Sequence, residues 1–157
     1  MSENQEASRG GIGTQPPAPI PPAAGTLTDD EKLWGMLAHL SVLLTYVTVI
    51  PFANLVGPAI VYFAYKDKSK FVRFHAIQTF VFQLGLTIFI FVMAIPIFIL
   101  TVLTFGLLAV FLALVWLLLL VWIIYMGIQA NKGEHCMYVL VGTWAYRKVY
   151  EEDWKPL

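Results

Sequence analysis

The fold of this chain is decided by one stretch, residues 74–130, which reads FHAIQTFVFQLGLTIFIFVMAIPIFILTVLTFGLLAVFLALVWLLLLVWIIYMGIQA. It contains no Lys, Arg, Asp or Glu and is dominated by Phe, Ile, Leu and Val. A helix needs about 20 such residues to cross a hydrocarbon core of about 30 Å, so this stretch is long enough to cross, turn and return. The sequence therefore predicts a membrane protein in which this stretch forms a helical hairpin.

The charges of the chain are segregated from its apolar stretches. The 157 residues are 59% hydrophobic, and ten basic side chains balance ten acidic ones. Residues 33–65 form a second charge-free stretch, so the charges lie before it, in the connector 66–73, and after residue 130. This pattern predicts a single all-α membrane bundle built from two helical hairpins. The neutral balance argues against nucleic acid as a partner.

The expected organisation has three parts. Residues 1–28 are rich in Pro and Gly and lack the apolar core of a signal peptide, so they predict a disordered cytoplasmic tail. Residues 136–157 mix charges with aromatic side chains, including Tyr138 and Tyr150, and are expected to lie at the membrane interface. Between them we expect a transmembrane bundle over residues 29–135, with segments at 29–50, 52–65, 71–100 and 107–130.

Two local signals refine the first hairpin. Thr28, followed three residues later by Glu31, is typical of a capped helix start. Pro51 predicts a break that divides residues 33–65. The second piece, residues 52–65, has a length that fits either a short tilted span or a re-entrant limb.

The two predicted hairpins give a topology. They place both termini and the connector on one side of the membrane, and that side then holds all ten Lys and Arg. The positive-inside rule identifies this side as the cytoplasm. The basic side chains of the connector are candidate contacts for anionic lipid headgroups: Lys66, Lys68, Lys70 and Arg73.

A polar stripe runs along the third segment. His75, Thr79, Gln83 and Thr87 recur at intervals of four, and Gln78 lies beside them. Polar groups at membrane depth need hydrogen-bond partners, so the stripe is expected to face another helix. Two interpretations stay open, namely polar contacts that hold helices together and the lining of a narrow polar path.

The sequence offers few groups for chemistry. His39, two turns inside the first helix, could approach His75 or share an ion with it, but two histidines without a nearby carboxylate are an incomplete set for zinc or haem. The neighbouring His135 and Cys136 also lack two further ligands, and a single cysteine forms no internal disulfide. No nucleotide-binding, nucleophile or metalloprotease motif is present. We therefore expect no enzyme, no catalytic residue, no metal and no cofactor.

Several short motifs carry a resemblance to a known family. They are Leu37 to Ser41, Pro51 to Pro58, Phe71 to Gln78 with Phe82 and Gln83, and Ala130 to Glu134. With this order and spacing the chain resembles a family of small prokaryotic membrane proteins of unknown function, grouped with the Tic-type import component of the chloroplast inner envelope. The resemblance implies a multi-pass helical bundle in the prokaryotic cytoplasmic (inner) membrane and suggests a part in protein translocation.

The resemblance and the polar stripe together select the candidate functional or helix-packing positions. These are His39, Asn54, Gly57, Pro58, His75, Gln78, Thr79 and Gln83. Asn54 with Gly57 and Pro58 fits a helix break in which the amide of Asn54 satisfies loosened backbone groups.

The function expected from the sequence is that of a non-enzymatic membrane component. It assists a larger membrane complex or self-associates, and small side chains that permit close helix approach, such as Ala109 and Ala113, favour this interpretation. Its expected partners are the lipid bilayer, including anionic lipids, and further copies or a larger complex. The alternative is a transport or protein-translocation component whose polar path is lined by the stripe.

Overall fold

The computed structural model describes residues 26–45 and 52–151, and within them every regular element is helical. The elements are α1 (Asp29–Leu40), the 3₁₀ turn η2 (Ser41–Leu43), α3 (Ala53–Tyr65), α4 (Lys70–Leu103), α5 (Leu107–Asn131) and α6 (Gly142–Tyr150). The all-α prediction is confirmed for this part of the chain. Residues 1–25 of the predicted tail 1–28, the break at Pro51 and the last six residues lie outside the described residues. The end of the predicted tail was wrong, because Leu27 is buried in the core and Thr28 caps α1.

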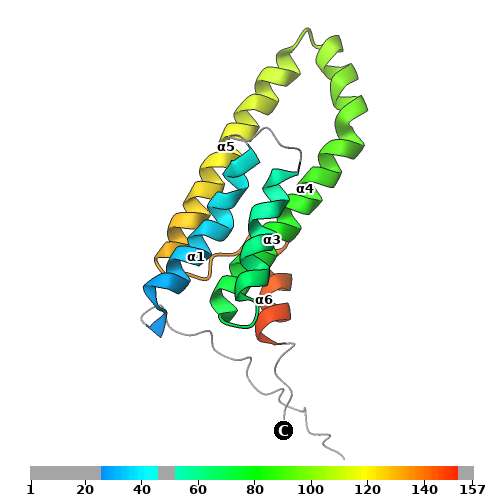
Figure 1. Ribbon diagram of the computed structural model, residues 1–157. Helices are drawn as coiled ribbons and strands as arrows, with labels where there is room; N and C mark the ends of the chain where they lie inside the picture. The colour runs from blue at the N-terminus through cyan, green and yellow to red at the C-terminus, as the bar shows by residue number, and fades with distance from the viewer. Residues whose placement is uncertain (1–25, 46–51, 152–157) are drawn as a thin grey trace, which may run out of the picture.

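The helices α4 and α5 form a long hairpin (Figure 1). Both are long and apolar enough to cross a membrane. The chain reverses between them at Phe105 and Gly106, whose φ angles of 50° and 85° are left-handed. The helices extend slightly beyond the expected 71–100 and 107–130, so the reversal is tighter than the sequence predicts.

The shorter elements cover one half of this hairpin (Figure 1). Helix α1 packs against α4 and α5, α3 packs against α4, and α6 packs against α4 near its start. We call this half, which also carries the α3–α4 connector, the basal half. Large apolar side chains between Ile88 and Leu118 are mostly exposed, and we call residues 88–118 the outer hairpin.

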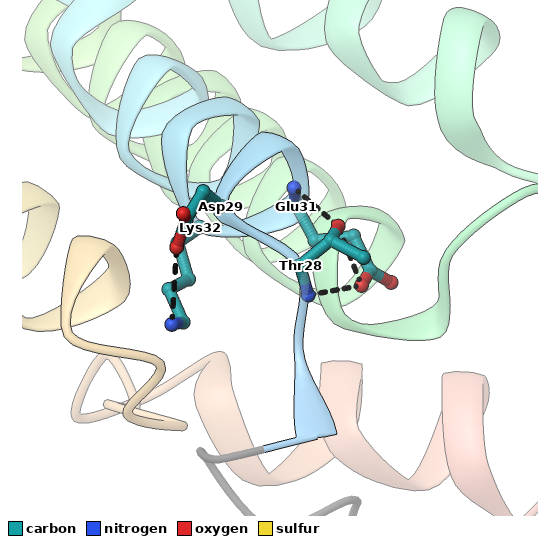
Figure 2. Close-up of polar contacts among 4 residues, drawn as sticks. All are labelled: Thr28, Asp29, Glu31 and Lys32. Atoms are coloured by element: carbon teal, nitrogen blue, oxygen red, sulfur yellow. Dashed lines mark hydrogen bonds and ion pairs between the residues drawn. The ribbon is translucent and has the colours of Figure 1, made fainter.

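The start of α1 is fixed by a capping box (Figure 2). The amide N–H of Glu31 donates to Oγ1 of Thr28 at 3.2 Å, and the amide N–H of Thr28 donates to Oε2 of Glu31 at 2.9 Å. These bonds satisfy donors that a helix start leaves without partners. The cap predicted from Thr28 and Glu31 is confirmed.

The path of α3 differs from the expected helix break. Pro58 lies inside a continuous α3, and the Asn54 amide donates to Oε1 of Gln83 at 3.3 Å and to Oγ1 of Thr87 at 3.1 Å. The prediction that Asn54 satisfies a break in its own segment was wrong, because α3 tolerates the proline and Asn54 faces α4 instead. With 13 residues, α3 is only about 20 Å long, shorter than a hydrocarbon core.

Glycine allows the basal helices to approach one another closely. A Cβ atom on Gly57 of α3 would lie 2.4 Å from Cβ of Ser41 in η2. Real Cβ atoms do not come this close, so α3 and η2 reach their spacing because residue 57 has no side chain.

The segment after α5 returns to the basal half instead of lying on its surface. Tyr138 is 2% exposed and stacks on Phe82 with ring centroids 4.5 Å apart, and Tyr150 is 3% exposed beside Phe74, Ala145 and Val149. Both tyrosines therefore pack against other side chains, and the placement of residues 136–157 at the membrane interface stays a prediction. Their rings fill the space between α4, α6 and the segment 132–141.

Candidate functional site

A cluster of buried polar side chains lies inside the basal half. His39 comes from α1, His75, Gln78 and Thr79 come from α4, and Tyr138 comes from the segment after α5. The first four are fully buried. Together with Cys136 we call these residues the basal cluster.

His39 and His75 are at the centre of the basal cluster. Nε2 of His39 lies 2.9 Å from Nδ1 of His75. The other ring nitrogen of His39, Nδ1, lies 3.0 Å from Oγ1 of Thr79 and 3.1 Å from the hydroxyl of Tyr138. Burial raises the pKa of Tyr138, so this hydroxyl keeps its proton and can donate it to a ring nitrogen. The cluster therefore forms a continuous hydrogen-bond chain across three parts of the sequence.

Gln78 fixes the backbone that carries Cys136 and Tyr138. Its Nε2 donates to the carbonyl oxygen of Cys136 at 2.9 Å, and its Oε1 accepts from the amide N–H of Tyr138 at 3.2 Å. The side chain of Gln78 thus satisfies one backbone carbonyl and one backbone N–H of a non-helical segment, as an adjacent strand would. Nε2 of Gln78 also lies 3.3 Å from Nδ1 of His75, which joins this contact to the histidine pair.

Aromatic rings enclose the cluster. The ring of Phe71 meets the ring of His75 edge-on with centroids 4.5 Å apart, and Phe74 meets it at 5.0 Å. Phe82 covers Tyr138 from the other side. In such surroundings an unpaired polar group is costly, and the other polar groups of the cluster are hydrogen-bonded to one another or to backbone. Nε2 of His75 is the exception, with no hydrogen-bond partner among the described residues.

A second polar contact lies farther along α4. It joins Asn54 of α3 to Gln83 and Thr87 of α4, beside a cavity of about 110 Å³. Oγ1 of Thr45 and Nε2 of Gln83 line this cavity and have no hydrogen-bond partner among the described residues. The cavity is large enough for water molecules that would satisfy these atoms.

The candidate positions therefore divide into three places. His39, His75, Gln78 and Thr79 meet in the basal cluster, Asn54 and Gln83 meet between α3 and α4, and Gly57 and Pro58 are buried in α3. The basic side chains Lys66, Lys68 and Lys70 are exposed at the connector, and Arg73 is partly buried at the start of α4. Of the stripe, His75, Gln78, Thr79 and Gln83 are buried against other elements, and Thr87 is partly buried.

Sequence reasoning missed two members of the cluster. Tyr138 and Cys136 lie in a segment without helical periodicity, so no spacing places them beside His39 and His75. One ligand atom from each of His39, His75 and Cys136 lies within 4.8 Å of the others. His135, the sequence neighbour of Cys136, instead has Nε2 2.9 Å from the hydroxyl of Tyr150. Burial raises the pKa of the Cys136 thiol to about 11, so the free thiol is protonated at neutral pH.

Over the described residues these features define an all-α protein with two helices long and apolar enough to span a membrane and a polar cluster buried in the basal half. Residues 30–145 match the model of the magnetosome magnetite crystal formation protein family (MamF/MmsF). The chain belongs to this family of magnetosome membrane proteins. Comparison with curated proteins and with solved structures gave no match.

The family match corrects the resemblance described above. The matching family is not the Tic-like one, so the assignment from the short motifs was wrong. A membrane location is supported, but the specific placement in the cytoplasmic membrane has no support from this family. The motifs include positions that serve packing in this structure, such as Gly57 between α3 and η2 and Gln78 against the segment after α5. Helical membrane proteins of different families need such positions.

Proposed function

We propose that this protein is a non-enzymatic, multi-pass membrane component that contributes to magnetite crystal formation by associating with further copies of itself. The observation that carries the proposal is the outer hairpin. Its large apolar side chains are exposed over residues 88–118, whereas the polar side chains of the basal cluster are buried against one another. The basal cluster then acts as the fixed base from which the hairpin projects.

The outer hairpin carries a surface suited to close contact between helices. Ala109 and Ala113 are one helical turn apart on α5, and both are exposed. Small side chains at this spacing let two helices approach in lipid, where packing and not hydrophobic burial stabilises the contact. We place the contact between copies on this face of α5.

The proposed topology follows from helix length and charge. Helix α4 is about 51 Å long and α5 about 38 Å, so both exceed the hydrocarbon core, whereas α3 is shorter than it. We propose that α4 and α5 span the membrane and that α3 enters as a short limb. The connector, with Lys66, Lys68 and Lys70 exposed, then faces the cytoplasm beside both termini.

The experiment that tests self-association is a pair of matched substitutions. Ala109→Leu with Ala113→Leu adds bulk to the proposed contact, and we expect the oligomer found in mild detergent to shift to monomer. The control, Ala64→Leu, makes one such change at an exposed position of α3 and should leave the oligomer intact. A wild-type protein that is monomeric in detergent and in liposomes would contradict the proposal.

A second candidate function is transport along the polar stripe. It is favoured by the cavity where Oγ1 of Thr45 and Nε2 of Gln83 have no hydrogen-bond partner among the described residues. The threonine oxygen could accept a hydrogen bond from the water shell of a passing ion. In this case Gln83→Leu would reduce uptake of ferrous iron into liposomes, measured with an enclosed chelating dye. If Gln83→Leu takes up as much iron as the wild type, or if the wild type takes up none, transport is ruled out and the stripe serves only helix packing. The protein-translocation version depended on the Tic-type resemblance and falls with it.

A further inference from the structure

Three metal-binding side chains meet inside the basal cluster although they are far apart in the sequence. His39 comes from α1, His75 from the second turn of α4, and Cys136 from the non-helical segment after α5. One potential ligand atom from each lies within 4.8 Å of the other two. Both imidazoles are fully buried, and the thiol is partly buried.

We propose that His39, His75 and Cys136 form a binding site for one divalent transition-metal ion of borderline softness, the class that includes Zn²⁺, Fe²⁺ and Co²⁺. Imidazole nitrogen and thiolate sulfur bind ions of this class, whereas Mg²⁺ and Ca²⁺ prefer oxygen ligands. Three protein ligands leave one position of a tetrahedral ion for water or another small ligand. The site does not depend on self-association.

The distances between the potential ligand atoms are close to those found around a bound tetrahedral ion. The facing nitrogens, Nε2 of His39 and Nδ1 of His75, are 2.9 Å apart. Two nitrogens that bind one tetrahedral ion lie about 3.3 Å apart, and a sulfur lies about 3.6 Å from each, given usual bond lengths. The imidazoles therefore need to separate by only a few tenths of an ångström. At the upper limit of 4.8 Å, the sulfur would move in by about 1 Å. Rotation of the Cys136 side chain can supply this shift while Gln78 holds the backbone, and it ends the 3.4 Å contact of Sγ with the carbonyl oxygen of Met126.

The surroundings support ligation because they hold the ligands in place. A metal-binding histidine usually donates its second ring N–H to an oxygen, and Nδ1 of His39 faces the oxygens of Thr79 and Tyr138. Gln78 holds the carbonyl of Cys136 and so fixes the residue that carries the third ligand. When the ion binds, the proton between the imidazoles moves to Nδ1 of His39, and the thiol releases its proton to solvent.

The test uses the full-length protein in mild detergent, stripped of metal with a chelator and titrated with Co²⁺. We expect one Co²⁺ per chain, with the near-ultraviolet absorption that marks a cobalt–thiolate bond. Cys136→Ser should abolish this absorption, and His39→Gln or His75→Gln should weaken binding at least tenfold. His135→Gln changes a neighbouring histidine outside the site and should leave binding unchanged.

A second readout does not require a variant to fold. Cys136 is the single cysteine of the chain, so alkylation by a maleimide reports on this residue alone. Stoichiometric Zn²⁺ should slow alkylation of the wild-type protein at least tenfold, and Mg²⁺ should have no effect. The proposal is overturned if wild-type protein shows no thiolate absorption with Co²⁺, or if Zn²⁺ leaves the alkylation rate unchanged.

Discussion

Nε2 of His39 lies 2.9 Å from Nδ1 of His75, and this contact joins α1 to α4 inside the basal cluster. Because both rings are fully buried, each provides the partner that the other needs. The relationship makes the stability of the basal half depend on the pair and not on either residue alone.

The histidine pair predicts a coupling that can be measured. His39→Leu and His75→Leu should each destabilise the protein by about 1–3 kcal/mol, because each leaves a buried polar group without its partner. The double variant should cost less than the sum, since it leaves neither imidazole unpaired. Unfolding of the metal-free protein in detergent, followed by circular dichroism, measures this cycle. Strictly additive losses would contradict direct coupling.

The close approach at Gly57 predicts a second effect on stability. Gly57→Ala should destabilise the protein by about 1–3 kcal/mol, because its new Cβ overlaps Ser41 and pushes α3 away from η2. Gly85→Ala is the matched control, since nothing lies within 4 Å of a Cβ there, and it should be neutral or stabilising. Adding Ser41→Gly to Gly57→Ala should restore part of the loss. Equal effects at residues 57 and 85 would argue against close packing.

The carboxylate of Glu31 predicts how stability depends on pH. Partial burial acts to raise its pKa, but hydrogen bonds from Ser69 and Thr28 outweigh burial, so the pKa is lowered from its usual 4.5. A lowered pKa means that the folded state favours the charged form. This contribution is present above the unfolded pKa of 4.5 and is lost as the pH falls through the lower folded value.

Substitution of Glu31 should therefore reduce acid sensitivity. Glu31→Gln should lower the unfolding temperature at pH 7 and show a smaller further decrease between pH 6 and pH 4 than the wild type. Glu31 joins α1 to α4, because it accepts a hydrogen bond of 2.7 Å from the hydroxyl of Ser69, the N-cap of α4. Asp29→Asn is the control, because this exposed carboxylate contacts only its helix neighbour Lys32, at 3.4 Å, among the ion pairs of the described residues. An unchanged pH dependence in Glu31→Gln would contradict the role of this carboxylate.

The connector between α3 and α4 predicts a lipid preference. Lys66, Lys68 and Lys70 are exposed together there, and each basic group near an anionic membrane surface contributes about 1 kcal/mol. Replacing all three with Gln should reduce the number of phosphatidylglycerol molecules that remain bound in native mass spectrometry. Lys32→Gln, in α1, should retain them. Equal retention by both variants would show that the connector does not select anionic lipids.

The fold could be predicted from the sequence where a single local signal decides it. The charge-free residues 74–130 predict the hairpin, and the spacing of Thr28 and Glu31 predicts the capping box, because both depend on neighbours in the chain. The effect of Pro58 on α3 was harder to predict. A proline removes one helical hydrogen bond, but the surrounding packing decides whether the helix continues.

The site could be predicted only in part. The four-residue interval of His75, Thr79 and Gln83 indicated a buried face, and His39 was a correct candidate for contact with His75. Cys136 and Tyr138 could not be placed in the same way. Their position depends on hydrogen bonds to Gln78, which lies about 60 residues earlier and leaves no periodic trace in the sequence.

The proposed association of outer hairpins is tested most directly by disulfide crosslinking in membranes. In a Cys136→Ser background, a single cysteine is introduced by Ala113→Cys or, as a control, by Ala64→Cys, and mild oxidation is applied before solubilisation. Association through α5 should give a covalent dimer from the cysteine at position 113 and little from position 64, because only the former lies on the proposed contact. Equal crosslinking at both positions, or none at position 113 or its neighbours on the same face of α5, would show that the hairpins do not associate through this face.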